Sequence, residues 1–286
     1  MSVVQPNMLA KPLAVLSGLM SALLMLVAID AAADQQELYL GSVAMDIPAA
    51  MHKRLQPLTK YLSAGLGQPV KLKLSPNMDA AIHDISRGAV DLAYLTPVAY
   101  LKAHEEGGAR LLVKTITDSE GSFQLMIVVK EHSPIKTVAD LKGKVFAFGD
   151  KAAVLQRAVL VHAGVKMEEL KGYKFIGHYD NIVPAVINGD FDAGILKDTT
   201  AYRWKGKGLR ILYASPALPP YNIAVSKNVS DELYEKLQDL FLRLNSGDAR
   251  HLAIIHSIDG NYSGFAATSD GEYDIIRELI KPFNAP

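Results

Sequence analysis

Short apolar runs alternate with stretches of helical periodicity along most of the chain. The segments 37–43, 70–74 and 90–95 have the alternating or continuous apolar pattern of strands, whereas apolar residues recur every three or four positions over 49–66 and 78–87, which predicts helices. Further strands are predicted at 122–129, 145–148, 174–176, 193–196, 209–213 and 223–225, and further helices at 138–141, 152–163, 182–188, 273–280 and after Ser230. Strands that alternate with helices favour an α/β fold with parallel sheets.

Two segments, 80–91 and 182–192, repeat one local pattern. Each has a helical stretch, then a glycine, and then an aspartate that opens an apolar strand. The repetition suggests two similar α/β halves. The alternative is that helix, glycine and strand follow one another in many α/β proteins, in which case the repeat says nothing about domains.

The first 33 residues differ from the rest of the chain. Lys11 is followed by an apolar stretch from 12 to 28, and Ala31-Ala32-Ala33 precedes Asp34. This is the pattern of a secretory signal peptide cleaved after Ala33, and it predicts a periplasmic location. A retained N-terminal membrane anchor is the alternative, although the apolar run is shorter than the roughly 20 residues of a spanning helix.

Composition excludes several classes of protein. The chain of 286 residues has a formal net charge of zero and 49% hydrophobic residues, so it has no basic surplus for nucleic acid and enough apolar residues for one large or two ordinary domains. It contains no cysteine, which excludes disulfides, thiolate metal sites and a cysteine nucleophile. The histidines lack the spacing of a metal site and no nucleophile motif is present, so we expect no enzyme, no cofactor and no bound metal.

The strongest family signal lies between Gly121 and Asp150. This stretch, GSFQLMIVVKEHSPIKTVADLKGKVFAFGD, contains an apolar strand, a Lys-x-x-Ser-Pro-Ile turn, an Asp-Leu-Lys-Gly-Lys element and a strand that ends in Phe-Gly-Asp. It resembles the phosphate/phosphonate-binding branch of the periplasmic solute-binding proteins of ABC transporters. Further segments resemble the same family in the family's order, at 56–62 (QPLTKYL), 91–100 (DLAYLTPVAY), 177–194 and 260–275.

The resemblance implies a fold class and a division into lobes. The implied fold is the periplasmic-binding-protein type II fold, an α/β fold in which two lobes are joined by a hinge of two crossing strands and close over a solute. Residues 34–122 and 221–286 would form lobe one and residues 123–220 lobe two, after the signal peptide at 1–33. The apolar strand at 122–129 and the proline-rich segment 216–221 are expected to be the crossings.

Candidate ligand-binding residues lie in loops that follow predicted strands, because open α/β sheets bind ligands beyond the carboxyl ends of their strands. The candidates are Asp46, Tyr94, Thr96, Lys151, Ala152, Ala153, His178, Tyr179 and Lys197. Backbone N–H groups at helix N-termini in these loops would attract an anion. Each candidate also has an ordinary structural interpretation, as a core aromatic, a turn residue or a solvated charge.

Two departures from the family pattern bear on the ligand. The family has Ser/Thr-rich residues after Phe-Gly-Asp, and this chain has Lys151-Ala152-Ala153, so side-chain donors are missing there. Lys197 stands where the family has an acidic residue that meets a ligand amine, and a lysine would repel that amine. The resemblance therefore favours a small oxyanion of the phosphate, phosphite or phosphonate class over an aminoalkylphosphonate.

The predicted function is that of the solute-binding component of an ABC transporter. We expect a monomer whose partners are a small anionic ligand and a membrane permease. A ligand-binding sensor that reports to a membrane sensor kinase or chemoreceptor is the alternative, since both use the same cleft. A degenerate protein whose cleft no longer holds an oxyanion is a third possibility, suggested by Ala152 and Ala153.

Overall fold

The computed structural model describes residues 1–2, 37–43, 48–118, 120–151 and 153–283. The described residues from Leu38 onward belong to one compact unit. The predicted signal peptide, apart from its first two residues, and the candidates Asp46 and Ala152 lie outside the described residues. Within those residues, no helix is both long enough and apolar enough to cross a membrane.

The first of two sheets has six strands in the spatial order β11-β4-β10-β3-β1-β2. Its strands are β1 (Leu38–Val43), β2 (Val70–Ser75), β3 (Leu92–Leu95), β4 (Arg110–Thr117), β10 (Asn222–Val225) and β11 (Tyr262–Ala266). Strand β1 pairs in parallel with β2 and β3, and β10 runs antiparallel to both β3 and β4. Strands β3 and β4 therefore point the same way, and their carboxyl ends lie at the same edge of the sheet.

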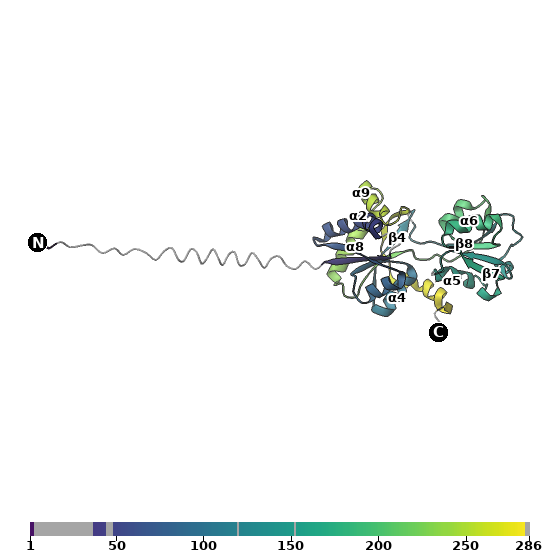
Figure 1. Cartoon of the computed structure of the whole chain (residues 1–286), viewed down its shortest axis with the longest axis horizontal. Helices are drawn as coiled ribbons and strands as arrows, with labels where there is room; N and C mark the ends of the chain where they lie inside the picture. Colours follow the sequence, from purple (N-terminus) through teal and green to yellow (C-terminus); the bar gives the residue numbers. More distant parts are fainter. Residues whose placement is uncertain (3–36, 44–47, 119, 152, 284–286) are drawn as a thin grey trace. The chain divides into compact units, whose positions relative to one another are not determined.

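Helices cover both faces of the first sheet (Figure 1). On one face lie α2 (Pro48–Leu66), α8 (Asp231–Arg243) and α9 (Ala249–His256), and on the other α3 (Met78–Ser86) and α4 (Pro97–Gly107). The alternation of side chains along a strand explains this arrangement. Leu38 and Leu40 of β1 pack into the cluster under α2 and α8, whereas Tyr39 packs into the cluster under α3 and α4.

The second sheet has five strands in the order β7-β6-β8-β5-β9. Its strands are β5 (Leu125–Lys130), β6 (Val145–Phe148), β7 (Gly172–Phe175), β8 (Ala193–Lys197) and β9 (Leu209–Ala214). Its helices are α5 (Val154–His162), α6 (Tyr179–Asn188) and α7 (Asp198–Trp204). Strands β6, β7 and β8 are parallel, so their carboxyl ends share one edge, while β5 is antiparallel to β8 and β9.

Two chain segments connect the sheets. The first, residues 118–124, leads from β4 to β5, and the second, residues 215–221, leads from β9 back to β10. They are bonded to each other at Phe123 and Leu218, whose backbones exchange hydrogen bonds of 2.9 and 2.8 Å. The Leu218 side chain is fully buried. The predicted fold class, two α/β lobes with a hinge of two crossing strands, is thereby confirmed, while the residue bounds predicted for each lobe stay a prediction.

One hydrophobic cluster continues from the first sheet to the second. It contains Ala93 and Leu95 of β3, Phe146 of β6, and Ile276 and Leu279 of α10 (Asp274–Ile280), all of them buried. Helix α10 packs against α5 of the second lobe as well as against α4 of the first. The C-terminal segment therefore ties the two lobes together on the side where their cores meet.

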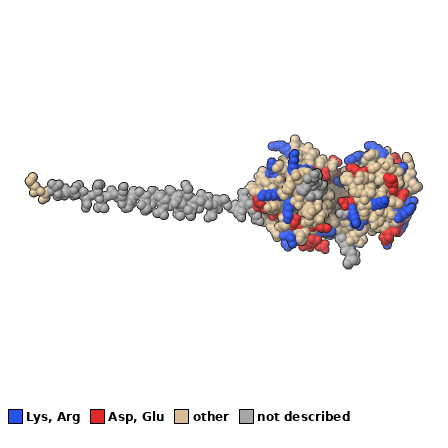
Figure 2. All heavy atoms as spheres, viewed as in Figure 1, with Lys and Arg blue, Asp and Glu red and all other residues tan. Residues whose placement is uncertain are grey.

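Some elements differ from the sequence prediction. The helices α4, α7 and α9 and the strands β4 and β11 were not predicted. The short helix predicted at 138–141 forms as a 3₁₀ helix, and further 3₁₀ helices form at 167–169, 270–273 and 281–283. Helix α7 has only seven residues, too few for a clear period. Helix α6 begins at Tyr179 rather than at Ile182, because His178 caps it. Positive and negative side chains are intermingled on the face drawn in Figure 2, in keeping with the zero net charge.

The close approach of α3 and α4 gives a test of this packing. A Cβ added at Gly107 would lie 2.4 Å from both the Cα and the carbonyl oxygen of Ser86, which are backbone atoms that cannot turn away. We expect Gly107→Ala to lower the free energy of unfolding by about 1–3 kcal/mol, measured by urea denaturation. A Cβ at Gly172 meets nothing within 4 Å, so Gly172→Ala should change it by less than about 0.5 kcal/mol. Equal effects of the two substitutions would contradict this packing.

Candidate ligand-binding site

A cluster of three tyrosines from distant parts of the chain lies at the end of β3. The Tyr94 hydroxyl is 2.5 Å from the Tyr262 hydroxyl of β11, and the Tyr94 ring stacks on the Tyr221 ring with centroids 5.1 Å apart and planes 25° apart. Tyr221 ends the second crossing segment, where its carbonyl oxygen accepts hydrogen bonds of 2.9 and 3.1 Å from the N–H and hydroxyl of Thr115. The stack therefore fixes the crossing segment to the first sheet.

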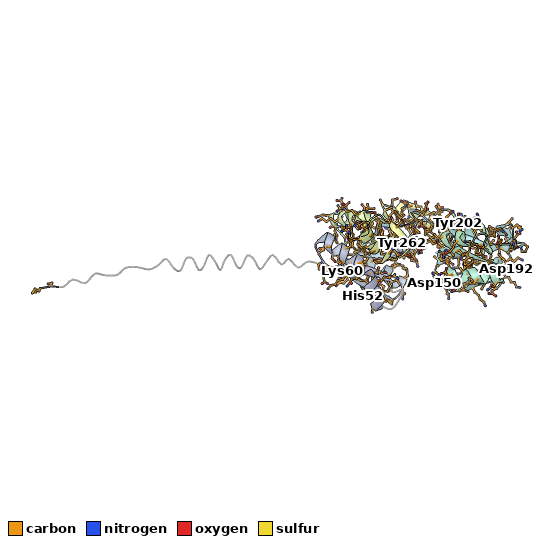
Figure 3. The ribbon with its side chains drawn as sticks, turned by 90° about the horizontal axis from the view of Figure 1, so that it is seen from above. His52, Lys60, Asp150, Asp192, Tyr202 and Tyr262 are labelled. Atoms are coloured by element: carbon orange, nitrogen blue, oxygen red, sulfur yellow. The ribbon has the colours of Figure 1, made fainter. Side chains whose placement is uncertain are left out.

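Tyr179, the first residue of α6, brings a fourth hydroxyl to this group. Burial raises its pKa to about 12, and Tyr221 and Asp198 contribute to the rise in that pKa. The Tyr179 hydroxyl accepts a hydrogen bond of 3.3 Å from the side-chain amide of Gln156, which is itself buried. We call Tyr94, Tyr179, Tyr221 and Tyr262 the tyrosine cluster. It joins residues of both lobes, and Figure 3 shows Tyr262 among the elements of the first lobe.

Burial, with a smaller contribution from nearby carboxylates, keeps the hydroxyls of the tyrosine cluster neutral. Burial raises the pKa of Tyr221, and the carboxylates of Asp259 and Asp150 raise that pKa further. Burial also raises the pKa of Tyr94 and of Tyr262 above the usual value for tyrosine. The hydroxyls of the cluster are therefore protonated at neutral pH, and each can donate a hydrogen bond without carrying charge.

The side chain of Gln156 forms a hydrogen bond with the backbone of the loop that follows β6. The Gln156 side-chain oxygen accepts a hydrogen bond of 2.7 Å from the N–H of Gly149, and the N–H of Ala153 donates to the carbonyl of Asp150 at 3.1 Å. Ala153 is the N-cap of α5 and has no capping side chain, and Lys151 is exposed. Two of the backbone N–H groups in the loop predicted to hold an anion are therefore already engaged within the protein.

Two other predicted residues act as helix caps. The Thr96 hydroxyl accepts a hydrogen bond of 3.1 Å from the N–H of Ala99 at the start of α4. The His178 ring accepts one of 3.3 Å from the N–H of Asp180 at the start of α6, and the same ring lies 3.2 Å from the Asp180 carboxylate. Both side chains thus have the structural role of holding a helix end beside Tyr94 or Tyr179.

A cavity of about 390 Å³ lies next to the crossing segments. It is lined by Thr117, Asp118, Glu120, Ser122, Phe123, Gln124, Lys197, Asp198, Thr199, Tyr202 and Ala217. Thr117 ends β4 of the first sheet and Lys197 ends β8 of the second, so strand ends from both sheets border one space. In Figure 3, Tyr202 belongs to the second lobe. None of the four tyrosines is among the residues that line the cavity, but the charge of Asp198, which does line it, contributes to the raised pKa of Tyr179.

Three residues of this site were missed in the sequence. Tyr221 and Tyr262 reach Tyr94 only because β10 and β11 return to the first sheet, and nothing in the helix sequence VLQRAVLVH distinguishes Gln156 from the polar Arg157 beside it. The sequence indicated that the proline-rich segment 216–221 crosses between the lobes. Tyr221 is the last residue of that segment, and this position was the one available indication of its role. Among the described residues, no group of three or more His, Cys, Asp or Glu side chains could hold a metal ion.

Two lobes joined by paired crossing segments, with strand ends of both sheets around one cavity, define a solute-binding protein of the periplasmic type II fold. The profile of the family described as "ABC transporter, phosphonate, periplasmic substrate-binding protein" matches residues 40–273. The chain belongs to this family, as the segment 121–150 indicates in the sequence.

Relatives with known names are binding and import proteins. The phosphonates-binding periplasmic protein of Escherichia coli (strain K12) is 23% identical over 265 residues, which are 86% of this chain and 77% of the relative. The phosphate-import protein PhnD of Mycolicibacterium smegmatis is 22% identical over 273 residues, 84% of each chain. The structure of PhnD1 from Prochlorococcus marinus in complex with methylphosphonate has a TM-score of 0.68 at 20% identity, and covers 88% of this chain and 99% of that one. This last likeness shows the fold.

The raised pKa values predict how the protein responds to alkaline pH. A folded-state pKa above the unfolded value of about 10 means that the neutral phenol is favoured by folding, so this stabilisation is complete below pH 10 and is lost as the pH rises through about 12. Titration of tyrosinate absorbance should show a late phase in the folded protein that is absent in urea. Tyr179→Phe should shrink that phase. Ionisation of all tyrosines near pH 10 in the folded protein would contradict the buried cluster.

Proposed function

We propose that this protein captures a small oxyanion of the phosphate, phosphite or phosphonate class between its two lobes and presents it to the membrane permease of an ABC transporter. The observation that best supports the proposal is that strand ends of both sheets, Thr117 and Lys197, line one cavity. Open α/β sheets bind ligands beyond the carboxyl ends of their strands. In a two-lobed protein, a ligand at such a place contacts both lobes and stabilises the closed form.

Neutral hydroxyl donors give this site a way to hold an anion. Because the Tyr179 hydroxyl accepts from Gln156, its own proton is left to point toward another acceptor. Tyr221 as a residue is 37% exposed although its ring stacks on that of Tyr94, so a ligand can reach it. Hydrogen bonds from such donors to a charged oxygen are stronger than those between neutral groups. The tyrosine cluster replaces, in this proposal, the side-chain donors that Lys151-Ala152-Ala153 lack.

The ligand class in the proposal follows the relatives. One is named for binding phosphonates, one for importing phosphate, and the structure of a third holds methylphosphonate. Within this proposal, Tyr94 and Tyr179 are walls of the site and Lys197 is its positive charge. A role in binding for Asp46, Lys151, Ala152 and Ala153 stays a prediction, as do the cleaved signal peptide, the permease as partner and the monomeric state.

Calorimetry tests the proposal directly. The purified protein is unfolded, dialysed free of trapped solute, refolded and titrated with phosphate, phosphite, methylphosphonate and sulfate. We expect one-to-one binding of at least one phosphorus oxyanion. Tyr179→Phe should weaken that binding roughly tenfold or more, the effect of losing one hydrogen bond to a charged group.

A second tyrosine provides the matched control. Tyr173 of β7 is 44% exposed and lies outside both the tyrosine cluster and the cavity, so Tyr173→Phe should leave the affinity unchanged. The absence of heat with all three phosphorus oxyanions would refute the proposal. Equal losses for the two tyrosine variants would remove the role given to Tyr179.

A further inference from the structure

Residues 270–283, which we call the C-terminal segment, are fixed to the first lobe by polar contacts. The Asp270 carboxylate accepts a hydrogen bond of 2.6 Å from the Tyr100 hydroxyl of α4. The Glu272 carboxylate lies 2.5 Å from the ammonium nitrogen of Lys114 in β4. Because both contacts reach elements of the first lobe, the C-terminal segment moves with that lobe.

The C-terminal segment also contacts the second lobe, through α5. Figure 1 shows the C-terminal helix, in yellow, beside α5, against which it packs. One buried hydrophobic cluster contains residues of both helices, namely Ile276, Leu279 and Ile280 of α10 and Leu155 and Val159 of α5. The two lobes are therefore linked at a third place in addition to the two crossing segments.

The end of the C-terminal segment contributes to a stack of two rings and one cation. The guanidinium carbon of Arg157 in α5 lies 5.6 Å from the centroid of the Phe283 ring and 5.8 Å from that of the Phe175 ring. Arg157 forms no ion pair with a carboxylate of the described residues, and its Nε is buried there without a hydrogen-bond partner. Cation–π attraction holds this contact together, whereas the unsatisfied donor costs free energy, so the contact can be released without breaking an ion pair.

Arg157 belongs to the part of the second lobe that carries the candidate site. Its neighbour Gln156 donates a hydrogen bond to the Tyr179 hydroxyl, and Phe175 ends β7, from which the chain runs into α6. A rotation of the second lobe about the crossing segments carries α5 and β7 along, while Phe283 stays with the first lobe. The contact between Arg157 and Phe283 therefore exists in only part of the range of lobe orientations.

We propose that the C-terminal segment sets the balance between orientations of the two lobes when no ligand is bound, and that the contact between Phe283 and Arg157 is the part of it that is released when the lobes rotate. The contact favours the orientation in which Phe283 covers Arg157, so weakening it populates other orientations. A single cation–π contact changes the ratio of two conformations roughly threefold or more. The inference goes beyond the proposed function, because it holds whichever solute the protein binds.

Single-molecule fluorescence energy transfer measures the lobe orientation in protein that has been unfolded, dialysed free of solute and refolded. Dyes are attached to two introduced cysteines, Lys53→Cys in α2 and Lys207→Cys in the loop after α7, both at exposed positions. We expect Phe283→Ala to raise the fraction of molecules outside the main population roughly threefold or more. Arg157→Met should have a similar effect, and the double variant should show no more than Arg157→Met alone, because both substitutions remove the same contact.

Two variants and a second pair of dyes provide the controls. Phe283→Tyr keeps an aromatic ring over Arg157 and should keep the distribution of transfer efficiencies. Leu242→Ala shortens an apolar side chain of α8 that is 41% exposed and lies on the other face of the first sheet, and should also keep it. Dyes at Lys53→Cys and Lys227→Cys lie within the first lobe, so their distribution should be the same in every variant.

Two results would overturn the inference. The first is a distribution between the lobes that stays unchanged in both Phe283→Ala and Arg157→Met. The second is a change of equal size in the pair of dyes within the first lobe, because the effect would then be a loss of structure and not a rotation of the lobes. Neither result bears on the proposed function, which calorimetry tests separately.

Discussion

The two backbone hydrogen bonds between Phe123 and Leu218 are the constraint on which the rest of the site depends. They hold the two crossing segments together as a short antiparallel ribbon, with Leu218 buried beneath it. The ribbon brings the carboxyl ends of β4 and β8 to one cavity, although these strands belong to different sheets. It also places Tyr221, at the end of the second segment, against Tyr94. The site is thus a consequence of how the chain crosses between its lobes.

The chemistry of this site differs from that of a loop rich in hydroxyl side chains. Gln156 satisfies the N–H of Gly149 and the hydroxyl of Tyr179 at once, so one buried amide orders two elements of the second lobe. The donors that remain are phenol hydroxyls, and nearby carboxylates with burial keep them protonated. In the proposed function, these hydroxyls hold an anion by neutral hydrogen bonds.

The sequence was sufficient for the fold class and for part of the site. Apolar strands that alternate with helices, together with the segment 121–150, predicted two α/β lobes. The strand-end rule selected Lys197, which lines the cavity, and Tyr94, which lies in the tyrosine cluster, and a binding role for either stays a prediction. The sequence could not reveal Tyr262, which is 168 residues from Tyr94. The two hydroxyls come together only because of the order in which the strands of the first sheet lie side by side. The capping roles of Thr96 and His178 were also hidden, because a hydroxyl or imidazole in a loop has the same appearance in sequence whether it binds a ligand or a helix end.

The proposed closure of the two lobes over a ligand is directly measurable, because the chain contains no cysteine. Spin labels can be attached to two introduced cysteines, Lys60→Cys in α2 and Lys174→Cys in β7, at positions that are exposed. Electron–electron double resonance then gives the distribution of distances between the labels with and without saturating methylphosphonate or phosphate. We expect a bound ligand to move the distribution to a single shorter distance. An unchanged distribution in a sample that has bound its ligand would contradict it.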